Sequence, residues 1–304
     1  MNLRQALYMK TIAEKGGGVT AAAKKLYISQ PSLSQMLRQI EEEAGVPLFD
    51  RSSLSFRPTY AGERYLHAAS VLLNTNEILE NELREIRGEE RGRLRLGISM
   101  LRSAQLLPCI LPEFASRFPK VEVSLQEAGS AKLEQLLQEG SVDMALASTE
   151  PNNPLLEYRL LQKERIGILA GPASPLAQRF PPGTAISLKE TENGRFVALK
   201  AGHSVRVIQD RLFQEHGLHP GFFLETDNME TAQQIALRCG CYLLCPDSYL
   251  PSGAPFYPLD GYESRRHFYA CLRKKEHVPQ YAEALLYLIV QYTSEGAALL
   301  NAEK

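Results

Sequence analysis

Residues 20–51 contain two short amphipathic helical patterns separated by a tight break, and this stretch constrains the fold more than any other. Only Tyr27-Ile28-Ser29 separates the two patterns, so the connection is a short turn. Ser29 or Gln30 can cap the second helix, and Pro31 falls in its first turn, where a missing N–H costs little. The apolar face of that helix has three- and four-residue spacing, at Leu33, Met36, Leu37 and Ile40. Two such helices around a short turn predict a helix-turn-helix.

The exposed face of the second helix carries hydrogen-bonding side chains that suit base edges and phosphates. Gln30, Ser32, Gln35 and Arg38 are expected in the major groove, whereas Ser34 and Thr59 are expected at phosphates. Thr20 precedes the first helical pattern and is expected to cap it. A solvated polar helix face is the alternative interpretation. The complete predicted DNA-binding set is Thr20, Ser29, Gln30, Pro31, Ser32, Ser34, Gln35, Arg38, Arg51, Arg57 and Thr59.

The length of 304 residues suits two or three domains. The formal net charge of −1 gives no sign of nucleic-acid binding by the whole chain, but residues 1–60 carry eight basic and five acidic side chains. A basic head on a near-neutral body fits DNA contact at one end. The chain has no signal-peptide pattern and no apolar run of membrane-spanning length, and its five cysteines are an odd count. These features predict a cytoplasmic protein.

A long helix is predicted over residues 59–88, because apolar positions recur at alternating four- and three-residue spacing. These positions are Tyr65, Ala69, Leu72, Asn76, Leu79, Leu83 and Ile86. Such a heptad seam is typical of a helix that pairs with another helix, so a homodimer interface is expected. Packing of the seam on the helix's own domain is the alternative. Asn76 lies near the middle of the seam, where it can fix the register of the pair.

From residue 93 onward, strand and helix patterns alternate, which indicates βαβ units and a parallel sheet. Strands are expected at 94–98, 121–125, 142–147, 165–170, 196–199, 222–225, 242–245 and 267–272, and helices at 103–118, 131–139, 204–216, 229–238 and 279–293. The six histidines are scattered, and the sequence holds no nucleophile elbow, phosphate loop or HExxH motif. No enzyme activity, cofactor or metal site is therefore expected.

These patterns together resemble the LysR-type transcriptional regulators over essentially the whole chain. The matching residues of the head are Thr20, Ala22, Ala23, Leu26, Ser29-Gln30-Pro31, Ser34, Glu41, Gly45, Leu48-Phe49, Arg51, Thr59 and Ala61-Gly62. In the body, LRLGIS at 94–99, LLQEGSVDMALA at 136–147 and the segment from Gly240 to Pro246 also match. A pattern with this many separated positions is far more specific than one short motif.

The resemblance implies an α/β architecture with a helical head. It implies a winged helix-turn-helix at 1–58, a dimerising linker helix at 59–90 and a two-lobed effector domain with the fold of periplasmic solute-binding proteins. Lobe I is expected to comprise 91–160 and 267–304, and lobe II 161–266. The implied partners are promoter DNA, a small-molecule effector, further copies of the chain in a dimer or tetramer, and RNA polymerase if the protein is an activator.

In this fold a ligand lies between the lobes, at strand ends and helix N-termini, where free N–H groups attract anions. By alignment, the effector-binding positions are Ser99, Met100, Arg102, Ser130, Ser148, Lys200, His203, Ser204 and Thr226. Hydroxyl groups and a few cations predict a small, polar or anionic ligand. The alternative for each serine and threonine is a helix cap without contact to a ligand.

The sequence departs from the family pattern at three positions. Gln35 stands where the family often has arginine. Glutamine favours adenine where arginine favours guanine, so the operator half-site is expected to differ. Leu54 stands where the wing tip is often basic, and Tyr242 stands where a glycine is usual and is expected to narrow the cleft or the helix–strand turn.

The segment CGCYLLC leaves a second hypothesis open. In this alternative, Cys239, Cys241 and Cys245 form a thiol-redox or metal-responsive cluster on the same scaffold. Alternate residues of a strand face opposite ways, and three thiolates need a fourth ligand or an open position at a zinc ion. Buried cysteines without a sensing role are the simpler interpretation.

Overall fold

The computed structural model describes residues 1–14, 18–50, 56–88, 91–261 and 266–302. The chain divides into two compact units, one built on Met1–Arg91 and one that begins at Gly92. Over the described ranges, every helix is too short or too polar to cross a membrane.

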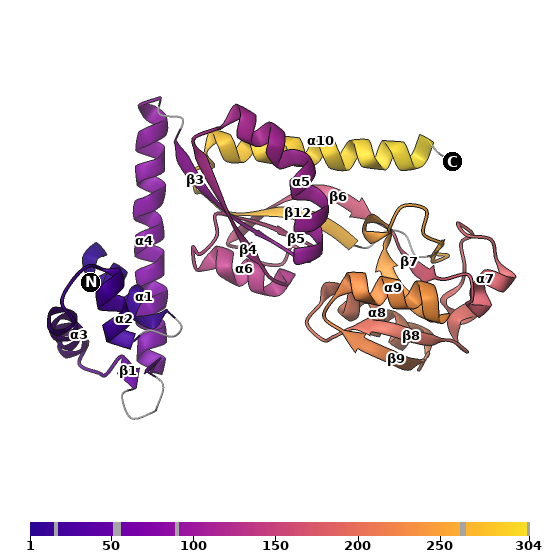
Figure 1. Ribbon diagram of the computed structural model, residues 1–304, viewed down its shortest axis with the longest axis horizontal. Helices are drawn as coiled ribbons and strands as arrows, with labels where there is room; N and C mark the ends of the chain where they lie inside the picture. Colours follow the sequence, from indigo (N-terminus) through magenta and orange to yellow (C-terminus); the bar gives the residue numbers. More distant parts are fainter. Residues whose placement is uncertain (15–17, 51–55, 89–90, 262–265, 303–304) are drawn as a thin grey trace. The chain divides into compact units, whose positions relative to one another are not determined.

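Three short helices and a two-stranded wing form the head of the first unit. They are α1 (Leu3–Ala13), α2 (Gly18–Lys25), α3 (Gln30–Ala44), β1 (Phe49–Asp50) and β2 (Arg57–Pro58), followed by the long helix α4 (Tyr60–Ile86). Met9, Ala22 and Leu33, one from each short helix, are buried in a common core, which confirms the predicted helix-turn-helix. Figure 1 shows α1, α2 and α3 gathered around one end of α4.

Local capping explains where the recognition helix α3 begins and ends. The Ser29 side chain accepts a hydrogen bond from the Ser32 amide at 3.3 Å, and a proline occupies the first turn, as predicted. Gly45 ends the helix in the left-handed conformation, with φ of 71°. The prediction that Thr20 caps α2 is wrong, because α2 already begins at Gly18 and Thr20 lies inside it.

A carboxylate of the recognition helix helps to hold the base of the wing. Glu41 of α3 accepts hydrogen bonds from the backbone amides of Leu48 at 2.8 Å and Phe49 at 3.2 Å. β1 and β2 pair antiparallel, and the rings of Phe49 and Phe56 stack with centroids 4.7 Å apart. The wing tip, with Arg51 and Leu54, lies outside the described residues, so both predictions there stay predictions.

The second unit contains two five-stranded sheets with helices on their faces (Figure 1). The first sheet has the order β4-β3-β5-β12-β6, with strands β4 (Val121–Glu127), β3 (Gly92–Ile98), β5 (Met144–Ala147), β12 (Arg266–Arg273) and β6 (Leu156–Glu164). The second has the order β11-β7-β10-β8-β9, with β11 (Phe256–Pro258), β7 (Ile166–Ala170), β10 (Tyr242–Pro246), β8 (Arg195–Leu199) and β9 (Gly221–Thr226). The helices are α5 (Met100–Arg117), α6 (Ser130–Gln138), α7 (Pro175–Arg179), α8 (Ser204–His216), α9 (Met229–Cys239) and α10 (Gln280–Ala302), with short 3₁₀ turns η1 (Leu188–Thr191) and η2 (Asp247–Tyr249).

Both sheets contain the predicted parallel pairing, but each also contains antiparallel pairs that were not predicted. β3 pairs parallel with β4 and β5, and β8 pairs parallel with β9 and β10. β12, however, lies antiparallel between β5 and β6, and β7 lies antiparallel between β10 and β11. The chain leaves the first sheet after β6 and returns to it as β12, so the strands at the crossovers run opposite to the βαβ strands. The predicted lobe boundary at residue 160 falls inside β6.

Tyr242 packs in the core of the second sheet and does not line the pocket, which corrects the expectation that it narrows the cleft. It is fully buried, with its ring centroid 5.5 Å from that of Phe196. A Cβ atom added at Gly194 would lie 1.9 Å from the Tyr242 ring. The tyrosine therefore fits because residue 194 has no side chain.

We predict that Gly194→Ala destabilises the second unit by about 1–3 kcal/mol, because the new methyl group has no room beside the Tyr242 ring. The measurement is the urea midpoint of the full-length chain. Gly221→Ala is the matched control, because the space around Gly221 is open. In a Tyr242→Ala background the penalty should shrink, and a penalty that is unchanged there would contradict the explanation.

Candidate functional site

The candidate nucleic-acid surface is the exposed side of α3. Gln30, Ser32, Gln35 and Arg38 are exposed, and Ser34 is half-buried and accepts a hydrogen bond from the Gln30 amide at 2.9 Å. The opposite side of the helix carries Leu33, Leu37 and Ile40, all buried in the head core. The structure thus leaves the predicted base-reading side chains free of the fold.

The other predicted DNA contacts are distributed around α3. Thr20 is exposed on α2, Arg57 is exposed on β2, and Ser29 caps α3. Thr59 already has partners in the protein: its hydroxyl donates to the Pro47 carbonyl at 2.8 Å and accepts from the Gly62 amide at 3.0 Å. Thr59 therefore supports the start of α4, and a phosphate contact there remains a prediction.

The predicted dimer seam on α4 divides into two parts. Ala69 is fully buried, Tyr65 packs against the head core, and Leu72 is half-buried. Three apolar side chains near the end of the helix are exposed, namely Leu79 by 52%, Leu83 by 45% and Ile86 by 81%. Between the two parts, the Asn76 amide donates to the Glu80 carboxylate at 2.9 Å. The first part thus serves packing within the chain, and the second part leaves an apolar stripe uncovered.

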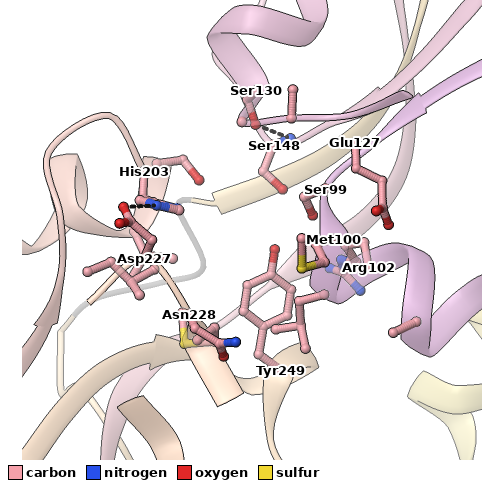
Figure 2. A pocket seen from close by; sticks show the side chains of 18 of the residues that line it. Ser99, Met100, Arg102, Glu127, Ser130, Ser148, His203, Asp227, Asn228 and Tyr249 are labelled. Carbon is pink, nitrogen blue, oxygen red and sulfur yellow. Dashed lines mark hydrogen bonds and ion pairs between the residues drawn. The ribbon is translucent and has the colours of Figure 1, made fainter. Parts of the chain in front are cut away.

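The second unit contains a cavity of about 310 Å³ where the strand ends of both sheets meet the starts of four helices. Figure 2 shows its lining, with Ser99, Met100, Arg102 and Glu127 on one side and His203 and Asp227 on the other. The volume fits a small molecule. Seven predicted effector positions line it, namely Ser99, Met100, Arg102, Ser130, Ser148, His203 and Ser204.

Helices α5, α6, α8 and α9 all begin at this pocket. The side chains that precede α5 and α8, Ser99 and His203, make no capping hydrogen bond, so the first-turn N–H groups of both helices lack a side-chain acceptor. Asn228 does cap α9, through a 3.0 Å bond from the Thr231 amide, and the Ser130 hydroxyl at α6 accepts from the Ser148 amide at 3.2 Å. Uncapped helix N-termini favour a bound anion.

A buried cluster of charges forms one wall of the pocket. Glu164, at the end of β6, is completely buried and forms ion pairs with two arginines, Arg102 of α5 and Arg266 of β12, which are only 7% and 5% exposed. Arg266 also donates to the Tyr249 hydroxyl at 2.9 Å, and Arg102 donates to the Ser248 hydroxyl at 3.0 Å. Two guanidinium groups share one carboxylate, so the cluster carries one excess positive charge.

The aromatic neighbours partly compensate for that charge. The Arg102 guanidinium lies 4.4 Å from the ring centroid of Phe268, and the Arg266 guanidinium lies 4.7 Å from that of Tyr249. Burial lowers the pKa of Arg102 to about 10. Burial alone would raise the pKa of Tyr249, but Arg266 and Arg102 outweigh it and lower that pKa to about 8. Figure 2 shows the Tyr249 hydroxyl pointing toward Ser99 and Ser148.

Two predicted effector positions lie beside the pocket and not in its lining. Lys200 is exposed and pairs with Asp227 at 2.6 Å, and the Thr226 hydroxyl accepts from the Asn228 amide at 3.1 Å. Sequence reasoning missed several lining residues, namely Glu127, Asp227, Asn228, Glu230, Tyr249, Arg266 and Phe268. The strand end at Glu127 and the helix start at Asn228 were available signals, because ligands in such folds lie at these places.

The cysteine segment has the features of ordinary packing. Cys241 and Cys245 are buried, and only Cys239 is exposed. Burial raises the pKa of the Cys245 thiol to about 12, and it also raises the pKa of Cys241. Both thiols therefore stay protonated and unreactive near neutral pH. Across the described ranges, no three His, Cys, Asp or Glu side chains are placed to hold a metal ion.

Family models match both units of the chain. The model described as a bacterial regulatory helix-turn-helix protein of the lysR family matches residues 3–63, and the model of the LysR substrate binding domain matches residues 87–294. Among curated relatives, the uncharacterized HTH-type transcriptional regulator YcgK of Bacillus subtilis is 31% identical over 252 residues, which is 77% of this chain and 76% of that protein. YybE, an uncharacterized HTH-type transcriptional regulator of the same organism, is 30% identical over 233 residues, 76% of this chain and 78% of its own.

Solved structures share the fold over nearly the whole chain. Full-length CbnR in complex with its target DNA matches 96% of this chain and 100% of its own, with a TM-score of 0.65 and 20% identity. A full-length OxyR variant from Pseudomonas aeruginosa matches 95% of this chain and 94% of its own, with a TM-score of 0.72 and 20% identity. Together with the family models, these likenesses show that the chain belongs to the LysR family of DNA-binding transcriptional regulators and carries that family's effector-binding domain.

Proposed function

We propose that this regulator responds to a small carboxylate-bearing effector that binds in the pocket between its two sheets. The observation that carries the proposal is the excess positive charge of the Arg102–Glu164–Arg266 cluster, which lies beside two uncapped helix N-termini. A buried net charge is costly unless it is balanced, and an anionic group of a ligand supplies the balance.

The same cluster provides a route from the pocket to the rest of the domain. Arg102 lies on helix α5, beside the first sheet. Its guanidinium group donates a hydrogen bond to the hydroxyl of Ser248, which follows strand β10 of the second sheet. Arg266 lies on strand β12 of the first sheet. Its guanidinium group donates a hydrogen bond of 3.3 Å to the hydroxyl of Ser204, the first residue of helix α8 beside the second sheet. An anion that competes for these guanidinium groups changes the contacts that join the sheets. The two lobes then shift, and with them the placement of the paired heads on promoter DNA.

The heads read DNA through α3, with Gln35 at a base edge and Arg57 of the wing at a phosphate. A glutamine side chain matches the donor and acceptor pair of adenine in the major groove. The exposed stripe of Leu79, Leu83 and Ile86 supports a homodimer, which supplies the two half-sites that one small head needs for specificity. Assembly into a tetramer and contact with RNA polymerase at activated promoters belong to this proposal.

Replacement of Gln35 by arginine should shift the preferred base at one operator position from adenine to guanine, by about 1–3 kcal/mol per half-site. The measurement is operator selection from a randomised DNA pool. Arg57→Ala is the contrasting variant: it should weaken binding to all sequences and reduce the salt slope by about 0.9 for each half-site that is bound. An unchanged base preference in the Gln35→Arg variant would remove Gln35 from base readout.

Replacement of Leu83 by glutamate should dissociate the dimer, because a charge would be placed in the middle of the apolar stripe of α4. Sedimentation velocity at micromolar concentration measures the result. Leu155→Glu is the control, because Leu155 is also an exposed leucine, 68% against 45% for Leu83, and lies in the loop before β6. A Leu83→Glu protein that stays dimeric would place the interface elsewhere on the chain.

A further inference from the structure

We infer that the effector is a zwitterion, a small α-amino carboxylate, whose carboxylate faces the arginine cluster and the helix N-termini while its ammonium group faces Glu127. This inference rests on the proposed function, because it assigns a chemical class to the ligand of the same pocket. It also accounts for a feature that the proposed function leaves unexplained: the pocket for an anion contains acidic side chains.

The pocket contains carboxylates that no cation neutralises. Glu127 and Glu230 both line it, and among the described residues no basic side chain lies within ion-pair distance of either. Glu230 has a local explanation, because it occupies the first turn of α9, where a negative charge is stabilised by the helix dipole. Glu127 is different, because it is the last residue of strand β4, and its exposed carboxylate lines the pocket from there.

Glu127 is held in place by the first turn of the neighbouring helix. The buried Ser103 hydroxyl of α5 forms a hydrogen bond with one carboxylate oxygen of Glu127. Ser103 directly follows Arg102, so the acid and the cationic cluster both lie beside the start of α5 (Figure 2). A ligand that uses both must carry its positive and negative groups close together, as an α-amino carboxylate does.

The third acid of the pocket is different, and the contrast selects Glu127 as the ammonium site. Asp227 pairs with Lys200 at 2.6 Å and lies 3.5 Å from the His203 ring, and the hydrogen bond from Lys200 lowers the pKa of Asp227. Its charge is therefore already balanced by the protein. Glu127 is thus the pocket carboxylate that has no basic side chain within ion-pair distance among the described residues and does not lie on a helix.

Like charges also argue against a simple anion. A monocarboxylate in this pocket would be attracted by the one excess positive charge of the arginine cluster. It would be repelled by the carboxylates of Glu127 and Glu230. An amino group on the same ligand converts the Glu127 repulsion into attraction. The remaining lining includes apolar side chains from both sheets, namely Leu146 and Phe268 from the first and Leu199 from the second, so the third substituent of the ligand is expected to be uncharged.

The inference can be tested by calorimetric titration of the full-length protein with matched pairs of compounds. Each pair consists of an amino acid with an uncharged side chain and its des-amino acid: glycine and acetate, valine and isovalerate, leucine and 4-methylpentanoate, phenylalanine and 3-phenylpropionate. For the side chain that fits, the amino acid should bind at least about tenfold more tightly than its des-amino partner, because a hydrogen bond between charged groups is gained. Isoamylamine, which has no carboxylate, should not bind.

Glu127→Gln should reduce the preference for the amino acid over its partner by about tenfold and leave the affinity for the des-amino acid unchanged or higher. Glu122→Gln is the matched control, because Glu122 is exposed on the same strand and does not line the pocket. This variant should keep the native preference.

The outcomes separate this inference from the proposed function. A des-amino acid that binds as tightly as its amino acid, or a preference that survives Glu127→Gln, would overturn the zwitterion and leave a carboxylate effector standing. If none of the carboxylates binds, with or without the amino group, the proposed anion pocket itself is overturned.

Discussion

The buried ion cluster of Glu164, Arg102 and Arg266 is the interaction on which the effector domain depends. Glu164 is the last residue of β6 before the chain crosses to the second sheet, and Arg266 is the first described residue after it returns. The carboxylate therefore ties the two crossovers together, and Arg102 adds the start of α5. Removal of one partner from such a cluster leaves an unpaired buried charge, which typically costs 3–5 kcal/mol. The joint between the sheets thus includes buried charges, and the anionic effector that we propose would act on it directly.

The head shows how well local rules predict structure when the segment is short. The spacing of Leu33, Leu37 and Ile40, with a serine cap and Pro31, predicted the recognition helix, because capping and periodicity involve residues close in sequence. The linker helix was predicted equally well, but the role of its seam was not. Sequence spacing gives one face of the helix, and only the fold shows that Ala69 packs within the chain while Leu83 stays exposed.

The effector domain shows where such rules end. Strand β6 was missed although LEYRL at its start alternates apolar and polar residues, and the rest of the strand, LQKE, is mostly polar. Strands β7 and β12 were predicted as strands, but their antiparallel direction was not, because it is set by crossovers between distant segments. In the pocket, Ser99 and His203 could be placed by their position before a helix, whereas Glu164, Tyr249 and Arg266 look like ordinary surface residues in the sequence. Their importance comes from burial, which depends on the whole fold.

The carboxylate of Glu41 has a consequence for how regulation reaches DNA. Because it accepts hydrogen bonds from Leu48 and Phe49, it joins the recognition helix to the base of the wing. In the mechanism that we propose, a signal from the effector domain would therefore change the distance and angle between two intact reading heads and not the shape of either one. Operators should differ in their response to the effector through the spacing of their half-sites, while the bases preferred within each half-site stay the same.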